Sequence, residues 1–241
     1  MKKIICTVLA LICVFCVASC SEDASSYEKE SSVMPTIINT SEYTLYTNIF
    51  YNDYGSRFEN QKVTKTGTFT TLYDRYTGKT RYYVWGYNDN TKCCDWQWEF
   101  VAPDENNLPD NGSLVTLTGN FVKDSNALDG YWITDATLTV ITKYTPKSTY
   151  DIDMCTMDST LERVQIVNIQ NKSDYFDGKS VSAYGRINSD NSIQHPYYDG
   201  DFELSFTTSG KVPSIGTYVI VTGTLKNGVI ENAVVEETDL Y

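Results

Sequence analysis

Apolar and polar residues alternate along most of the chain after about residue 60, a pattern typical of β-strands with one buried face. Tyrosine is abundant and most aliphatic residues are β-branched, which favours strands over helices. We therefore predict an all-β protein with a hairpin turn at 74–80. The predicted strands are 62–72, 81–87, 96–101, 114–122 and 131–141, followed by 180–187, 202–206, 218–225 and 229–236.

Three stretches recur in the same order, which indicates an internal duplication. Residues 58–67 (FENQKVTKTG) match residues 176–185 (FDGKSVSAYG), with the phenylalanine, the valine and the last glycine at identical positions. Two further matches pair 109–119 with 213–223 and 130–136 with 228–233. We predict two homologous domains, at 34–147 and at 148–241.

The first predicted domain has five short strands and the second has four, and both domains carry a glycine inside two matching strands: 62–72 and 114–122 in the first, 180–187 and 218–225 in the second. A small barrel bends its long strands sharply, and a side chain would obstruct the bend. We predict two tandem OB-like five-stranded β-barrels, each preceded by a short helix, and keep a pair of small β-sandwiches as the alternative. For the second helix, Ser159-x-x-Glu162 predicts a capping box, with Leu161, Val164 and Val167 as apolar positions.

The N-terminus has the features of an export signal. Two lysines precede an apolar run at 4–17 that is too short to span a bilayer. The sequence VASC that ends at Cys20 resembles a bacterial lipobox, which implies cleavage before Cys20 and acylation of its thiol. An ordinary signal peptide with a coincidental cysteine is the alternative. We predict a lipoprotein signal peptide at 1–19, a flexible polar tether at 20–33, and a protein anchored by lipid to the extracytoplasmic face of the cell envelope.

Charge and motifs exclude several classes of function. The formal net charge is −12, and it becomes −14 once the two N-terminal lysines are removed, which argues against nucleic acid and anionic lipid headgroups as partners. The sequence contains no GxSxG, P-loop, HExxH or EF-hand motif, and we predict neither an enzyme nor a cofactor. His195 is the single histidine; it is either a structural loop residue or an acid–base group partnered by Asp199 or Asp201.

Three cysteines remain beyond the predicted lipidation site: the adjacent pair Cys93 and Cys94, and Cys155. An odd number of cysteines is not a disulfide framework. Three interpretations stay open. The cysteines are simply packed or reduced, or one disulfide forms within the pair or with Cys155, or thiolates bind zinc or copper with Cys155 or His195 as a further ligand.

Aromatic residues gather on adjacent predicted strands of the first domain: Tyr83, Trp85, Tyr87, Trp96, Trp98 and Trp132. Because barrel strands alternate between inward and outward positions, some of these side chains belong to the core. An outward stripe would instead form a stacking platform for a glycan or peptide. Alternation places Trp96, Trp98 and Phe100 on one face and Gln97 and Glu99 on the other.

Residues 42–143 resemble an uncharacterised domain of Firmicutes lipoproteins and membrane proteins. The shared features are Gly67-Thr-Phe69, Tyr82-Tyr83-Val84-Trp85, Cys93-Cys94, Trp98-Glu99-Phe100 and Val115-x-x-x-Gly119. A related CC-bearing segment ends a family of bacterial permease partner proteins, some of which are associated with zinc homeostasis. The resemblance implies an OB-like domain outside the cytoplasm and assigns no activity.

These observations predict a non-enzymatic binding or interaction module with a protein or glycan ligand. The alternative is metal handling, with zinc or copper, or thiol redox chemistry at Cys93 and Cys94.

Overall fold

The structure is a computed structural model that describes residues 36–38, 55–87, 95–196 and 202–239, and every structural statement below refers to these residues. Strands make up most of it and helices are few, so the all-β prediction is confirmed. The described strands coincide with the predicted ones to within a few residues at each end. Sequence patterning missed three short strands, at Thr36–Ile38, Ile152–Asp153 and Ser192–Gln194, which are too short to display an alternation.

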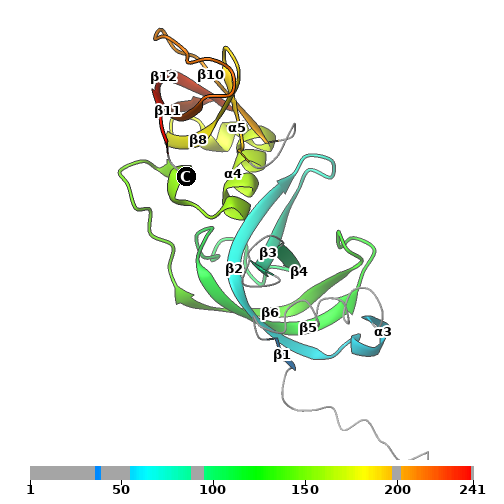
Figure 1. The fold of residues 1–241 in the computed structure, drawn as a ribbon. Helices are drawn as coiled ribbons and strands as arrows, with labels where there is room; N and C mark the ends of the chain where they lie inside the picture. The colour runs from blue at the N-terminus through cyan, green and yellow to red at the C-terminus, as the bar shows by residue number, and fades with distance from the viewer. Residues whose placement is uncertain (1–35, 39–54, 88–94, 197–201, 240–241) are drawn as a thin grey trace, which may run out of the picture. The chain divides into compact units, whose positions relative to one another are not determined.

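The first sheet is ring-like (Figure 1). Its strands are β1 (Thr36–Ile38), β2 (Lys62–Asp74), β3 (Lys79–Tyr87), β4 (Asp95–Phe100), β5 (Leu114–Lys123) and β6 (Tyr131–Thr142). They are ordered β1-β2-β3-β4-β6-β5, and β2 also pairs with β5. The long strand β2 pairs with two strands that are not neighbours of each other. Its residues 62–68 pair with β5, and its residues 68–74 pair with β3.

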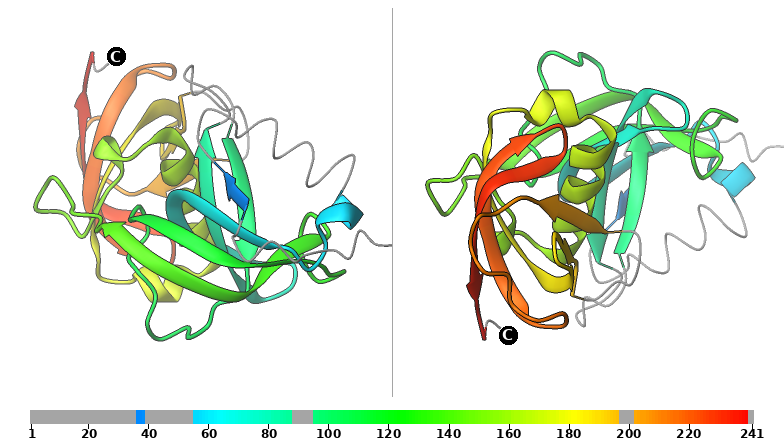
Figure 2. Two further views of the ribbon diagram at one scale, coloured as in Figure 1. Left: turned by 90° about the horizontal axis from the view of Figure 1, so that it is seen from below. Right: turned by 90° about the horizontal axis from the view of Figure 1, so that it is seen from above.

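The second sheet contains a closed five-stranded barrel (Figure 2). Its strands are β7 (Ile152–Asp153), β8 (Ser180–Ser189), β9 (Ser192–Gln194), β10 (Glu203–Phe206), β11 (Tyr218–Lys226) and β12 (Val229–Glu237). They are ordered β11-β12-β10-β9-β8-β7, and pairing of β8 with β11 closes the barrel. Strand for strand, this is the order of the first sheet.

The two sheets also agree in backbone detail at the positions that the sequence matches. Gly112 and Gly216 both have a φ of +90°, and each donates its N–H to the equivalent strand residue, Phe69 or Ile187. Phe100 pairs in parallel with Ile133 as Phe206 does with Ile230. The correspondence therefore extends from strand order to single hydrogen bonds.

A shared bulge explains the glycine inside the fourth strand of each copy. The register of β5 against β6 shifts at Gly119, and that of β11 against β12 shifts at Gly223. A Cβ on Gly119 would come within 2.4 Å of a methyl carbon of Ile133, and one on Gly223 within 2.6 Å of the Glu231 carbonyl oxygen. These glycines are needed because the neighbouring strand approaches too closely for any side chain, as the barrel argument predicted.

Two helices and a 3-10 turn lie at the start of the second barrel, whereas among the described residues the only helix before β2 is the four-residue α3 (Gly55–Phe58). They are η3 (Met154–Thr156), α4 (Ser159–Asn171) and α5 (Ser173–Phe176). The predicted capping box is wrong by one residue, because the N-cap of α4 is Asp158 and not Ser159. Asp158 accepts a hydrogen bond from the backbone N–H of Thr160, and a carboxylate there also suits the positive end of the helix dipole.

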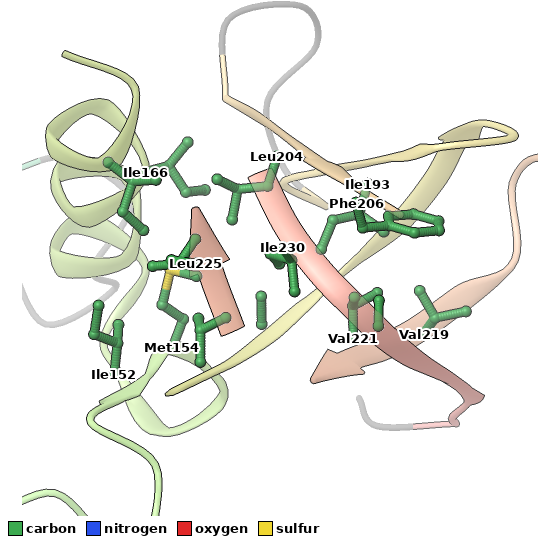
Figure 3. Close-up of a cluster of buried hydrophobic side chains, with 14 of the residues drawn as sticks. Ile152, Met154, Ile166, Ile193, Leu204, Phe206, Val219, Val221, Leu225 and Ile230 are labelled. Atoms are coloured by element: carbon green, nitrogen blue, oxygen red, sulfur yellow. The ribbon is translucent and has the colours of Figure 1, made fainter. Parts of the chain in front are cut away.

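Each sheet encloses its own hydrophobic core. In the first, Trp98, Phe100 and Phe121 are fully buried with the inward residues of β2 and β5. In the second, Ile166 and Ile169 of α4 pack against the barrel, and Figure 3 shows Ile166 at the end of the cluster that also holds Met154.

The other side of α4 contacts β2 of the first sheet, within one compact unit that spans residues 35–241. Beyond Thr68, one edge of β2 has no neighbouring strand among the described residues, and asparagine side chains bind its backbone instead. Asn168 accepts from the Tyr73 N–H and donates to the Thr71 carbonyl oxygen, at 2.9 and 2.7 Å. Asn111 and Asn171 bind the remaining Thr71 N–H and Tyr73 carbonyl. The α4 helix thus substitutes for a strand along this edge.

In the described part of the chain, no helix is both long and apolar enough to cross a membrane.

Candidate functional site

The aromatic residues of β3 divide between two faces, as strand alternation requires. Tyr82 and Val84 point into the core of the first sheet. Tyr83 and Trp85 belong to the opposite face, yet each is only 4% exposed. The reason is that this face is covered, because residues of α4 lie across it.

Tyr83 and Trp85 form one wall of an apolar pocket of about 320 Å³. The facing wall is α4, which contributes Val164 and Val167, two of the three apolar positions predicted for that helix. The other described lining residues are Thr70, Leu72, Gln97, Leu128, Thr160, Arg163 and Phe202. The helix therefore has two apolar faces, one against its own barrel through Ile166 and Ile169 and one toward this pocket.

Two polar atoms of the aromatic wall, the Tyr83 hydroxyl and the Trp85 Nε1, are buried and have no hydrogen-bond partner among the described residues. Burial raises the pKa of the Tyr83 phenol, and the nearby Glu99 carboxylate raises it further, so the hydroxyl stays a protonated donor. Buried donors are normally paired, and leaving one unpaired costs about 1–3 kcal/mol. The wall of the pocket therefore has hydrogen-bonding capacity that the described residues leave unused.

A charge network stabilises the end of this face. Arg81 donates to Asp74 at 3.1 Å and to Glu99 at 2.7 Å, and Glu99 also accepts from the Leu128 N–H at 2.7 Å. Glu99 is 5% exposed and the Arg81 side chain 10% exposed. The paired arginine and the backbone N–H offset the cost of burying this carboxylate. The network holds Leu128 against the pocket that it lines.

Beyond this network the pocket continues into a larger groove of about 1070 Å³ along the β2–β3 hairpin. The two share Leu72, Leu128, Val167 and Phe202. The groove adds polar and aromatic side chains, which are Tyr73, Asp74, Arg75, Tyr76, Thr77, Arg81, Gln170, Asn171, Glu203 and Ser205. Tyr76, at the hairpin tip, is 84% exposed, and the Arg75 guanidinium lies 4.8 Å from its ring centroid.

A second pocket, of about 410 Å³, lies where β3 separates from β2. Trp85 lines both pockets, and Lys65, Gly86, Tyr87 and Asp158 are among the residues that line this one. The Tyr87 hydroxyl donates a short hydrogen bond to the Asp158 carboxylate. Burial, together with this hydrogen bond, raises the pKa of Tyr87 to about 12.

The predicted aromatic site is only partly assembled. Trp85 and Tyr87 make an edge-to-face contact at 5.5 Å, and Tyr83 shares the pocket wall with Trp85. Trp98 is fully buried among core residues, so it belongs to the core and not to an outward stripe. Trp132 on β6 is half-buried and lines none of the pockets described above. Trp96 is in β4, but its side chain lies outside the described part of the structure.

The predicted cysteine site falls outside the described residues. Cys93 and Cys94 lie between 88 and 94, and the predicted lipidation site Cys20 lies before residue 36. Cys155 is a free, half-buried thiol 3.1 Å from the Ser182 hydroxyl, and burial raises its pKa, which disfavours a thiolate. Among the described residues no group of three or more His, Cys, Asp or Glu side chains could hold a metal ion. Zinc or copper binding and redox chemistry at Cys93 and Cys94 stay predictions.

His195 has a partner that the sequence did not indicate. It is 2% exposed, and its Nε2 lies 3.2 Å from an oxygen of Glu162, which is also buried. Burial raises the pKa of Glu162, and the contact with His195 partly offsets that rise. The predicted partners Asp199 and Asp201 lie outside the described residues. The pair joins α4 to the residue that follows β9, and both of its side chains are buried.

The chain matches no protein-family model, and no curated protein is significantly similar to it.

Proposed function

We propose that this protein is a lipid-anchored binding module of the bacterial cell envelope, and that its ligand is a peptide segment of a partner protein. The ligand would place an apolar side chain in the pocket between β3 and α4 and lay its backbone along the adjoining groove. Anchoring at Cys20 would hold the module at the membrane surface, with residues 20–33 as the tether.

The observation that carries this proposal is the wall formed by Tyr83 and Trp85. Both side chains face away from the core, line a 320 Å³ apolar pocket and contain buried donors that no described residue binds. Apolar pockets with a few unused polar groups are the usual form of ligand sites. A partner that supplies acceptors near these donors would remove an existing cost, which favours binding.

Among the predicted ligands, a peptide suits this geometry better than a glycan. Sugar rings stack on open aromatic faces, and the rings of Tyr83 and Trp85 are only 4% exposed. The pocket has room for one apolar side chain, and its continuation past Leu128 and Phe202 becomes polar, as a peptide backbone requires. The anchor-in-pocket arrangement is the one that dominates affinity in protein interfaces.

The same proposal includes the architecture: two OB-like barrels that arose by duplication. Its support is the strand order common to both sheets. When β2–β6 and β8–β12 are each numbered 1 to 5, both sheets have the order 1-2-3-5-4, and strand 1 also pairs with strand 4. In both sheets strands 3 and 5 pair in parallel. The division into domains at 34–147 and 148–241 and the resemblance to Firmicutes lipoproteins remain part of this proposal.

Filling the pocket should weaken peptide binding. A random peptide library displayed on phage would be selected on the immobilised chain, and recovered peptides should share one bulky apolar position. We expect Val167→Trp to weaken the best of them at least about tenfold in calorimetric titrations, or about 1.4 kcal/mol. The matched control is Ile215→Trp, which adds an indole at a 70% exposed position outside this pocket and should leave the affinity unchanged. Failure to enrich any peptide, or equal affinity for both variants, would rule the proposal out.

The lipid anchor has its own test. When the full chain is expressed in a bacterium, it should partition into the detergent-rich phase of a Triton X-114 extraction. Cys20→Ser should move it to the aqueous phase, because one thioether-linked lipid supplies the membrane affinity. A Cys13→Ser variant, altered inside the predicted signal peptide, should behave as the original chain does. If Cys20→Ser stays in the detergent phase, the lipobox assignment is wrong.

A further inference from the structure

Lys65 occupies an inward-facing position of the first sheet. Along β2, Val63, Lys65, Gly67 and Phe69 alternate with more exposed residues, and all four are buried. Lys65 is only 1% exposed, although lysine is among the residue types that are almost never fully buried. Its amine has therefore been taken out of bulk water by the fold of the barrel.

The second sheet shows that this architecture does not require a lysine there. The sequence match that pairs Val63 with Val181 and Gly67 with Gly185 pairs Lys65 with Ala183. Ala183 is buried in the core of the second barrel, in the equivalent register against the equivalent strand. The buried lysine therefore distinguishes the first sheet from the second.

Lys65 is one of the residues that line the second pocket. That pocket is lined by Lys65 together with Trp85, Gly86, Tyr87 and Asp158, from β3 and from the start of α4. Gly86 leaves open the space beside the amine, since a Cβ at that position would lie 3.4 Å from the Lys65 Nζ. A small molecule in the pocket would thus meet the nitrogen from the side of β3.

The chemistry of the lining favours a carbonyl compound over an anion. An anion site gathers several cationic or N–H donors, whereas Lys65 is the only basic side chain among the described residues that line this pocket, and Asp158 adds a carboxylate. Burial lowers the pKa of Lys65 from its ordinary value near 10.5 to about 7, so the amine is largely neutral at slightly alkaline pH. A neutral lysine in an apolar site is the nucleophilic form that condenses with aldehydes and ketones.

We propose that Lys65 captures a small aldehyde or ketone in this pocket by forming an imine. The Nζ lone pair attacks the carbonyl carbon, and the C=O π electrons move to oxygen to give a carbinolamine. The C–O bond then breaks and both amine protons leave with the oxygen as water, so that a C=N bond replaces the C=O bond. No electrons are gained or lost, and hydrolysis releases the compound. This pocket is distinct from the peptide pocket, so the inference does not depend on the proposed function.

The test traps the imine in the full-length protein. Propanal and sodium cyanoborohydride, which reduces an imine to a stable secondary amine, would be added at pH 7 in limiting amount and for a short time. Peptide mass spectrometry then compares propylation at Lys65 with that at Lys62 and Lys79, two exposed lysines on β2 and β3. At pH 7 about half of the Lys65 amine is neutral, against roughly one part in three thousand for an ordinary lysine. Allowing for restricted access, we expect Lys65 to react at least about tenfold faster.

Two controls connect the reactivity with the fold and the pocket. In 8 M urea (roughly the limit of its solubility) the preference for Lys65 should vanish, because the unfolded chain has ordinary lysines. Gly86→Val should slow modification of Lys65 and leave Lys62 unaffected, since the added side chain fills the space beside the amine. If Lys65 reacts no faster than Lys62 in the folded protein, or keeps its advantage in urea, the proposal is overturned.

Discussion

Lys65→Met is expected to stabilise the protein by about 4–5 kcal/mol at pH 6, an unusually large gain for one substitution. Methionine fills a similar volume and has no charge to desolvate, so the packing of the first core is kept. The measurement is urea-induced unfolding of the chain from residue 21, followed by tryptophan fluorescence. Most substitutions at buried positions destabilise, which makes the sign of the effect informative.

The gain should depend on pH in a defined direction. Folding lowers the pKa of Lys65 from about 10.5 to about 7, so between these values the unfolded chain binds a proton that the folded chain does not. The stability of the original protein therefore rises with pH across this window, and the penalty is complete below pH 7. The gain from Lys65→Met should be largest at pH 6 and close to zero above pH 10.5. The other titratable side chains of the pocket, Tyr87, Tyr144 and Asp158, are present in both proteins and cancel in the comparison.

Lys62→Met is the matched control, because Lys62 lies on the same strand and is exposed. Its effect should stay within about 0.5 kcal/mol at every pH. An equal gain at pH 6 and pH 10 would mean that the lysine is not titrating in this window. A loss of stability on Lys65→Met would mean that the amine is charged and compensated inside the sheet. Either result would also remove the chemical basis for imine formation at this position.

The strands could be predicted because their signal is local. The alternation of apolar and polar residues located β2, β3, β5, β6, β8, β11 and β12. The glycines at 119 and 223, where sharp bends were predicted, lie at the bulges. Alternation also separated Trp98 and Phe100 from Gln97 and Glu99 correctly. The predicted N-cap of α4 was wrong. Asp158 and Ser159 are both good N-cap residues, and only the path of the chain into α4 selects between them.

The pockets could not be predicted, because they depend on how α4 lies against β2 and β3. The sequence pattern predicts apolar positions at Leu161, Val164 and Val167, and in the structure these three line the two pockets. Ile166 and Ile169 of the same helix pack on the second barrel. The match between the two repeats aligns Lys65 with Ala183. The burial of Lys65 could not be predicted from it, because a lysine in an alternating strand ordinarily indicates an exposed position.

Asn168→Ala is expected to destabilise the protein by about 2–4 kcal/mol, because one fully buried side chain makes two hydrogen bonds to the exposed edge of β2. An alanine leaves the Tyr73 N–H and the Thr71 carbonyl without these partners, and the site is enclosed by α4 and β2, so water can replace the amide only by opening the contact. The measurement is again urea-induced unfolding, at pH 7. The loss should appear mainly as a lower midpoint with an unchanged denaturant dependence.

Asn171→Ala provides the comparison, since Asn171 makes one hydrogen bond to the same strand, to the Tyr73 carbonyl, and is only partly buried. Its loss should cost about 0.5–1.5 kcal/mol, in keeping with a single bond that water can replace. The peptide pocket adds a second consequence, because Val164 and Val167 belong to the helix that Asn168 holds in place. Asn168→Ala should therefore weaken a selected peptide more than Asn171→Ala does. If the two variants are equally stable, the edge of β2 is not held by the Asn168 amide, and the pocket wall must depend on the apolar contacts of α4 alone.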